Sequence, residues 1–288
     1  MSALPPAYRS ERETMEYDPG RGAWVARPSR RPFPRVQAIL FLLTAVSTIF
    51  AGGFAYSISL LAILVAHEMG HYLTARRHGI PATLPYFLPV PLTIFGTLGA
   101  VIKMDGRKAT RRQLFDVGLA GPLAGVVVAV PVTLLGIRLS SVVSEAGLEG
   151  TLALGDSILF SALQRLALGP LPDAHTLLLH PIAFAGWAGL YVTALNLIPV
   201  GQLDGGHVLY GLFGRKAAGI SLVALVGFTL IAISTYRYWL FLIFLILFFG
   251  YRHPPMLEEE ASLDTARKWL GVGTLALFLL AFTPIPIR

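Results

Sequence analysis

Long apolar blocks divide this sequence, and they constrain its fold more than any other feature. Each runs for roughly 17 to 25 residues, the length that crosses a bilayer as a helix. Charged residues make up only 14% of the 288, against about 25% in soluble domains. We therefore predict an all-α polytopic membrane protein with about seven transmembrane helices. The expected spans are residues 34–52, 55–76, 114–137, a span beginning near 178, 218–235, 238–252 and 268–285.

Residues 80–103 are apolar as well, but their proline content is incompatible with a regular helix. Prolines in a helix interior remove a hydrogen bond and clash with the preceding turn. Irregular backbone is tolerated at membrane depth only where protein or a water-filled cavity covers it. We predict a short re-entrant, β-like segment here, with a strand or hairpin within 93–102. The prolines are Pro81, Pro85, Pro89 and Pro91.

Basic residues collect on one side of the predicted spans. With the N-terminus inside, all but four of the 23 Lys and Arg residues fall on the inner side, as the positive-inside rule requires. The net charge of +7 is therefore explained by the topology of the chain in the lipid bilayer, and no nucleic-acid partner is expected. We predict a multi-pass integral protein of the cytoplasmic (plasma) membrane, with residues 1–33 as a flexible cytoplasmic tail. The four exceptions are Arg138, Arg165, Arg237 and Arg288.

The sequence His67-Glu68-Met69-Gly70-His71 lies within the second predicted span. Histidines at positions i and i+4 share one helix face, so both imidazoles can bind one metal ion, and the adjacent glutamate can act as general base. The chain has no cysteine, so a zinc site must be built from histidines and carboxylates. A carboxylate within an apolar span is costly unless it has a partner or a function. The motif predicts zinc bound by His67 and His71, with Glu68 as catalytic base.

A second motif, NLIPVGQLDGG, begins at Asn196 and ends the fourth predicted span. A catalytic zinc ion with two histidine ligands needs a third protein ligand and an open position for water. Asp204 is the candidate, because the glycines that follow it allow a close backbone approach. An Asp-Gly turn that ends a helix is the alternative explanation of this residue.

Together the two motifs resemble the site-2 protease family of intramembrane zinc metalloproteases (M50-type). That family pairs H-E-x-x-H with a later N-x-x-P-x-x-x-x-D-G, and GPLAG at residues 121–125 is similar to its motif on the intervening span. The resemblance covers a core of about residues 55–215 within a transmembrane metalloprotease domain at 34–288. It implies one zinc ion per chain, hydrolysis of peptide bonds in transmembrane protein substrates, and contact of Asn196 with the substrate backbone. It also implies that the segment around residues 95–102 pairs with an unwound substrate.

Two other functions are compatible with buried His, Glu and Asp side chains. A membrane transporter or metal carrier would use them as a permeation site, but it would usually show two related halves, and no internal repeat is evident. A catalytically inactive relative is disfavoured because all the motif residues are present. His78 is interpreted as an interfacial residue rather than a ligand, and His207 as a candidate hydrogen-bond partner around the metal. Gly125 stands where the family often has asparagine.

Overall fold

The computed structural model describes residues 13–18, 23–28, 34–104, 109–146, 153–236, 239–249 and 262–287. The chain forms two compact units, residues 1–35 and 36–288. In the first unit, β1 (Glu13–Asp18) pairs with β2 (Ala23–Pro28) as an antiparallel hairpin. The remainder of the predicted tail at 1–33 lies outside the described residues.

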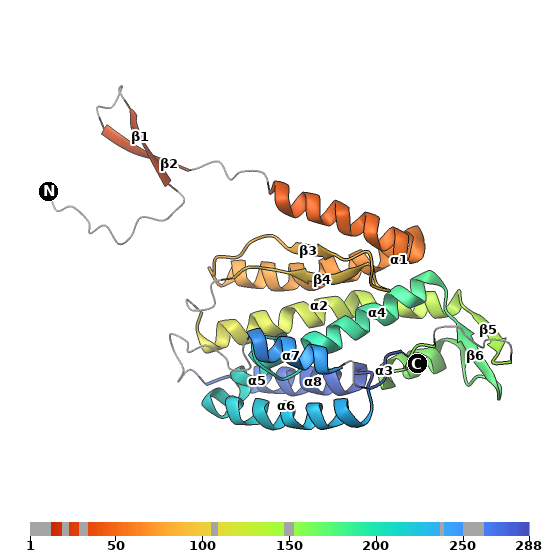
Figure 1. The fold of residues 1–288 in the computed structure, drawn as a ribbon. Helices are drawn as coiled ribbons and strands as arrows, with labels where there is room; N and C mark the ends of the chain where they lie inside the picture. Colours follow the sequence, from red (N-terminus) through yellow and green to blue (C-terminus); the bar gives the residue numbers. More distant parts are fainter. Residues whose placement is uncertain are drawn as a thin grey trace. The chain divides into compact units, whose positions relative to one another are not determined.

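Helix α1 (Arg35–Arg77) contains two predicted spans joined by a reversal. Its backbone leaves the helical region at Gly53, where φ is 82° and ψ is 178°, a conformation that favours glycine. A first arm (residues 35–52) and a second arm (54–77) then run back along each other (Figure 1). The hydroxyls of Thr48 and Ser57 lie 2.7 Å apart and join the arms near the reversal.

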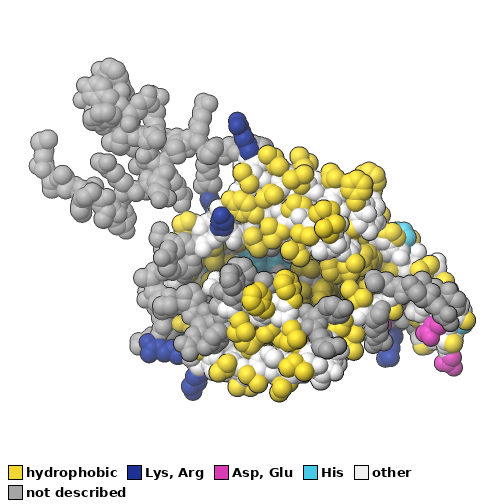
Figure 2. All heavy atoms as spheres, in the orientation of Figure 1, with side chains coloured by type: hydrophobic (Ala, Val, Ile, Leu, Met, Phe, Trp, Pro, Cys, Tyr) yellow, Lys and Arg dark blue, Asp and Glu magenta, His cyan; other side chains and the backbone are white. Residues whose placement is uncertain are grey.

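The second unit is mostly helical, and among its described residues three helical stretches are long and apolar enough to cross a membrane: residues 35–77, 111–138 and 204–234. Apolar side chains cover much of the visible face of this unit (Figure 2). The chain is thus a multi-pass membrane protein. The other helices are α2 (Arg111–Arg138), α3 (Ile158–Leu168), α4 (Pro181–Asn196), α5 (Asp204–Phe213), α6 (Ala217–Ser234), α7 (Trp239–Phe249) and α8 (Thr265–Ala281).

Two small two-stranded sheets accompany these helices in the described part of this unit, and the predicted β-like segment accounts for one of them. The expected β-like segment contains β3 (Tyr86–Pro89) paired antiparallel with β4 (Thr97–Val101). A second antiparallel strand pair, β5 (Ser141–Ser144) with β6 (His175–Leu178), was not predicted. Its strands are four residues each and far apart in sequence, so no local turn sequence predicts their pairing.

The tip of the β3–β4 hairpin is attached to both arms of α1 and to α4. Ser47 donates a hydrogen bond to the carbonyl of Gly96, and the Tyr56 hydroxyl donates to the carbonyl of Phe95 at 3.1 Å. The Phe95 ring also lies 5.9 to 6.3 Å from three aromatic rings of α4, within the range of favourable aromatic contacts. These rings belong to Phe184, Trp187 and Tyr191. The hairpin is therefore held in a defined position beside the helices.

Helix α2 packs closely against α4 because glycines face the contact. A Cβ atom on Gly136 would lie 2.1 Å from the backbone nitrogen of Ala183, and one on Gly186 would lie 2.3 Å from the Thr133 hydroxyl. Small residues allow this approach between membrane helices. Helix α2 also contacts α5 and lies between the second arm of α1 and α4 in Figure 1.

Candidate metal centre

Three predicted ligands from two distant segments converge in the structure. His67 and His71 lie one helical turn apart on the second arm of α1 and are 3% and 6% exposed. Asp204 is the first residue of α5. Its Oδ2 atom lies 3.2 Å from Nε2 of each histidine, and the two Nε2 atoms lie 3.1 Å apart. Folding thus brings two imidazole nitrogens and one carboxylate oxygen to a single point.

This triangle of donor atoms fits a zinc ion. Zinc bonds of about 2.0 to 2.2 Å to nitrogen and oxygen in a tetrahedral site separate neighbouring donors by about 3.3 Å. The three observed separations are 3.1 to 3.2 Å. Two histidines and one carboxylate are a typical ligand set for catalytic zinc, with the fourth position left for water or substrate.

A backbone carbonyl of α2 orients the second histidine. Nδ1 of His71 lies 2.8 Å from the carbonyl oxygen of Val117. Because a carbonyl oxygen can only accept a hydrogen bond, Nδ1 carries the proton. Nε2 is then the atom that can bind a metal ion together with His67 and Asp204. Ligating histidines usually have such a partner, which fixes the ring and its tautomer. The role of Val117 could not be predicted from the sequence, because a backbone carbonyl leaves no mark on residue type.

Asp204 begins a helix rather than ending one. Helix α4 ends at Asn196, and the chain makes a tight loop before α5 starts at Asp204. A Cβ on Gly205 would lie 2.0 Å from the carbonyl oxygen of Leu197, so the loop folds directly onto the start of α5. The helix-ending turn considered as an alternative is not formed. A carboxylate in the first turn also interacts favourably with the helix dipole.

Glycines of α2 leave room for the histidine rings. A Cβ on Gly121 would lie 2.0 Å from Nε2 of His71, and one on Gly125 would lie 3.1 Å from Nδ1 of His67. The backbone of α2 therefore forms one wall of the site. The sequence signal was the GPLAG motif at 121–125, but its relation to the histidines becomes visible only when the helices are placed side by side.

Of the remaining predicted residues, Glu68 and Asn196 lie beside the donors, whereas His78 does not. Glu68 is 5% exposed and adjoins His67 in the helix. The amide nitrogen of Asn196, at the end of α4, lies 3.3 Å from Nε2 of His67. His78 instead lies 3.1 Å from a carboxylate oxygen of Asp116, away from the three donors. The β-carbon of His207 would be 2.8 Å from a Cβ on Gly118, so His207 packs against α2.

The fold and this site define a membrane protein of the H-E-x-x-H class, in which a glutamate adjoins the first of two histidines that share one helix face. The sequence model of Peptidase family M50 matches residues 55–234, and the chain belongs to that family.

Several plant proteins are similar to this chain. It is 33% identical over 231 residues to probable zinc metalloprotease EGY2, chloroplastic, of Arabidopsis thaliana, covering 78% of this chain and 40% of that protein. It is 32% identical over 238 residues to probable zinc metalloprotease EGY1, chloroplastic, of Oryza sativa subsp. japonica, covering 79% and 39%. The chain thus spans about two fifths of the length of these relatives.

Proposed function

We propose that the chain is an intramembrane zinc metalloprotease that hydrolyses peptide bonds of transmembrane protein substrates. The observation that carries this proposal is the convergence of His67, His71 and Asp204 beside the buried Glu68. These donors lie on helical stretches that are apolar and long enough to span a membrane. Membership of Peptidase family M50 supports the same activity.

In this proposal each residue has a separate task. His67, His71 and Asp204 would hold one zinc ion, which would supply a Lewis acid for the attacking water and the peptide carbonyl. Glu68 accepts a proton from the water as it attacks and returns a proton to the leaving amine nitrogen. The Asn196 amide, 3.3 Å from a ligand nitrogen, is close enough to the site to donate a hydrogen bond to the substrate backbone.

The β3–β4 hairpin provides a place for the substrate in the same proposal. A helical substrate hides its peptide bonds in intrahelical hydrogen bonds, so it has to unwind before hydrolysis. An extended segment can then add to the hairpin as a further strand, and backbone hydrogen bonds provide the affinity. Phe95 attaches the hairpin tip to α1 and α4. This attachment keeps the hairpin strand that would pair with the substrate fixed relative to the histidines of α1.

Removing either histidine ligand should release the metal. We expect His67→Ala and His71→Ala to lose most of the zinc that the unaltered protein binds, because two protein ligands seldom hold this ion. The measurement is metal content per chain after purification, with one zinc expected for the unaltered protein. His175→Ala is a matched control, since His175 is exposed in β6. Full zinc occupancy in both ligand variants would contradict the assignment.

We further propose seven spans within a metalloprotease domain at 34–288, with its core at about 55–215 and the 1–33 tail on the basic side. The names of the relatives place them in chloroplasts, so the predicted plasma-membrane location has no support from them. The identity of the membrane and the orientation of the chain are separate questions, and orientation follows from the charge distribution.

The absence of native cysteine makes this orientation directly measurable. Single cysteines at Ser10 and Ser262 should react on one side of sealed vesicles with a membrane-impermeant maleimide. A cysteine at Ser144, an exposed residue of β5, should react only from the other side. Reaction of all three from the same side would show that the number of spans between them is wrong.

A further inference from the structure

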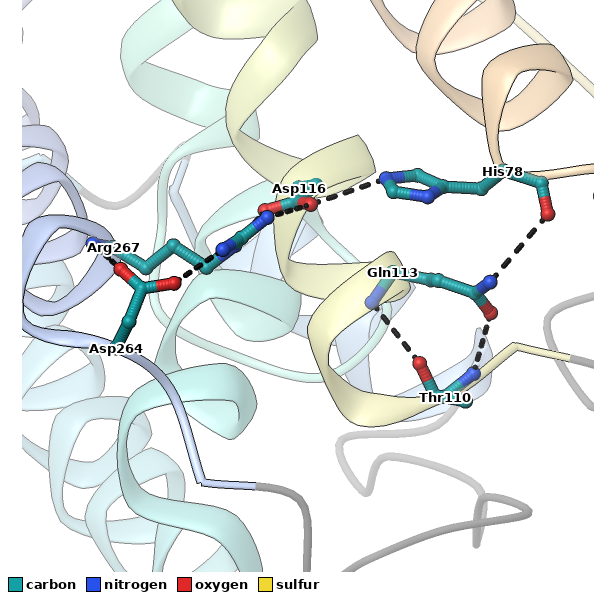
Figure 3. A network of polar contacts seen from close by, with 6 residues as sticks. All are labelled: His78, Thr110, Gln113, Asp116, Asp264 and Arg267. Atoms are coloured by element: carbon teal, nitrogen blue, oxygen red, sulfur yellow. Dashed lines mark hydrogen bonds and ion pairs between the residues drawn. The ribbon is translucent and has the colours of Figure 1, made fainter.

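Asp116 joins three helices at the end of the second arm of α1 (Figure 3). Its Oδ2 atom lies 3.1 Å from Nε2 of His78, directly after α1. Arg267 of α8 donates to both carboxylate oxygens, at 2.7 Å from Nε and 2.9 Å from Nη2. Such forked arginine–carboxylate pairs combine strength with a defined geometry. The Asp116 side chain is 18% exposed, so this junction is largely covered.

The neighbour of Asp116 in sequence contacts the metal centre. Val117 provides the carbonyl that accepts the hydrogen bond from Nδ1 of His71, at 2.8 Å. A displacement of α2 at Asp116 is therefore also a displacement of this carbonyl. The junction and the metal ligand are connected through one peptide unit.

The second arm of α1 and α2 run antiparallel, and their contacts follow one register. Going back along α1 from His78 to His67, the contacts on α2 move from Asp116 to Gly125. His78 meets Asp116, Gly70 lies against the carbonyl of Ala120, His71 lies against Gly121, and His67 lies against Gly125. Gly121 and Gly125 of α2 present no side chains to the two histidine rings, which lowers the resistance to sliding at these positions. Polar contacts at the junction can supply that resistance.

We propose that Asp116 is a positioning residue that sets the register of α2 against the second arm of α1, so that the Val117 carbonyl meets Nδ1 of His71. This inference rests on the zinc site proposed above. A slide of one residue along a helix is about 1.5 Å, which is enough to break a hydrogen bond of 2.8 Å. His71 would then lose the partner that holds its Nε2 toward the other donors.

The start of α2 contributes to the same junction. Thr110 and Gln113 form a capping box, in which the backbone N–H of each donates to the side chain of the other. The Gln113 amide also lies 3.5 Å from the carbonyl oxygen of His78 (Figure 3). Gln113 and Asp116 are three residues apart and share one helix face, so both approach the end of α1.

Asp264 offers a matched control for Asp116. It accepts from the same Arg267 guanidinium and caps α8 by accepting from the Arg267 backbone N–H at 2.9 Å. That N–H and the guanidinium lower the pKa of the Asp264 carboxyl. Asp264 is exposed and lies directly before α8. Asparagine is as good a helix cap as aspartate, so Asp264→Asn removes one negative charge beside Arg267 and keeps the helix start.

The experiment measures zinc affinity by competition with a chromogenic chelator, on the purified full chain in detergent. Asp116→Asn should bind zinc at least about tenfold more weakly than the unaltered protein, the usual consequence of disturbing a partner of a ligand. Asp264→Asn should stay within about twofold, and Asp116→Glu should recover part of the loss. His78→Ala cuts the same contact from the α1 side and should reproduce the loss if Asp116→Asn does not fold.

Two results would overturn the proposal, and they differ from each other. If Asp116→Asn lowers the melting temperature but binds zinc as tightly as the unaltered protein, Asp116 only stabilises the fold. If the unaltered protein itself binds no zinc, the metal site fails, and the positioning role fails with it. Because the readout is affinity rather than proteolysis, a missing substrate cannot imitate either result.

Discussion

Glu68→Gln is expected to reduce proteolysis by at least about 100-fold while zinc remains bound. A general base contributes about 10²- to 10⁴-fold, and glutamine keeps the shape of the side chain without the ability to take a proton. The three donor atoms belong to His67, His71 and Asp204, so the substitution removes no ligand. The assay is cleavage of a single-span substrate in liposomes, with metal content measured on the same preparation.

Asp204→Asn is the informative companion to this variant. It replaces an anionic ligand by a neutral amide of the same size, so zinc and activity should fall together. A Glu68→Gln protein that cleaves at the unaltered rate would end the metalloprotease proposal. The donor cluster would then be better explained as the binding site of a metal carrier.

Gly121→Ala is expected to abolish the metal site although it adds a single methyl group. The new Cβ would lie 2.0 Å from Nε2 of His71, the atom that faces the other donors. To relieve this overlap, either the His71 ring turns away or α2 moves back by more than 1 Å. Misplacement by about 1 Å can cost about 10²-fold in rate, so we expect at least that loss of cleavage. Weaker zinc binding in the chelator assay should accompany it.

Gly227→Ala controls for the general effect of alanine in a membrane helix. Gly227 lies within α6, and a Cβ there would meet no atom within 4 Å. This variant should keep zinc and activity, and alanine has the higher intrinsic helix propensity. Equal zinc affinity in Gly121→Ala and Gly227→Ala would show that the wall formed by α2 is further from His71 than the structure places it.

Local sequence was sufficient to predict the features that depend on spacing. Two histidines four residues apart must share a helix face, and the break predicted between the spans 34–52 and 55–76 is the reversal at Gly53. The β-like segment within 80–103 could also be predicted from its prolines. The assignment of Asp204, far along the chain, depended on the resemblance of the paired motifs to a family.

Features that depend on how elements meet could not be predicted in the same way. The Val117 carbonyl has no side-chain signature, and the β5–β6 pairing joins two segments with no turn between them. Asp116 left a faint signal, because an acidic residue within an apolar helix usually has a partner. Its partners, His78 and Arg267, lie far from it in the sequence, one before it and one after it. These contacts could therefore be identified only from the full fold.

The reversal at Gly53 has a consequence for how water reaches the reaction. The second arm starts there, so its histidines lie roughly 21 to 27 Å along the helix from the reversal, at about 1.5 Å per residue. The same count puts them only about 9 to 15 Å from Arg77 at the other end. Each hydrolysis consumes one water molecule. In a hydrocarbon layer of about 30 Å, the shorter path for water to the histidines starts at the end of the helix that carries Arg77. Water should therefore reach the site more readily from the face that carries the basic residues than from the opposite face.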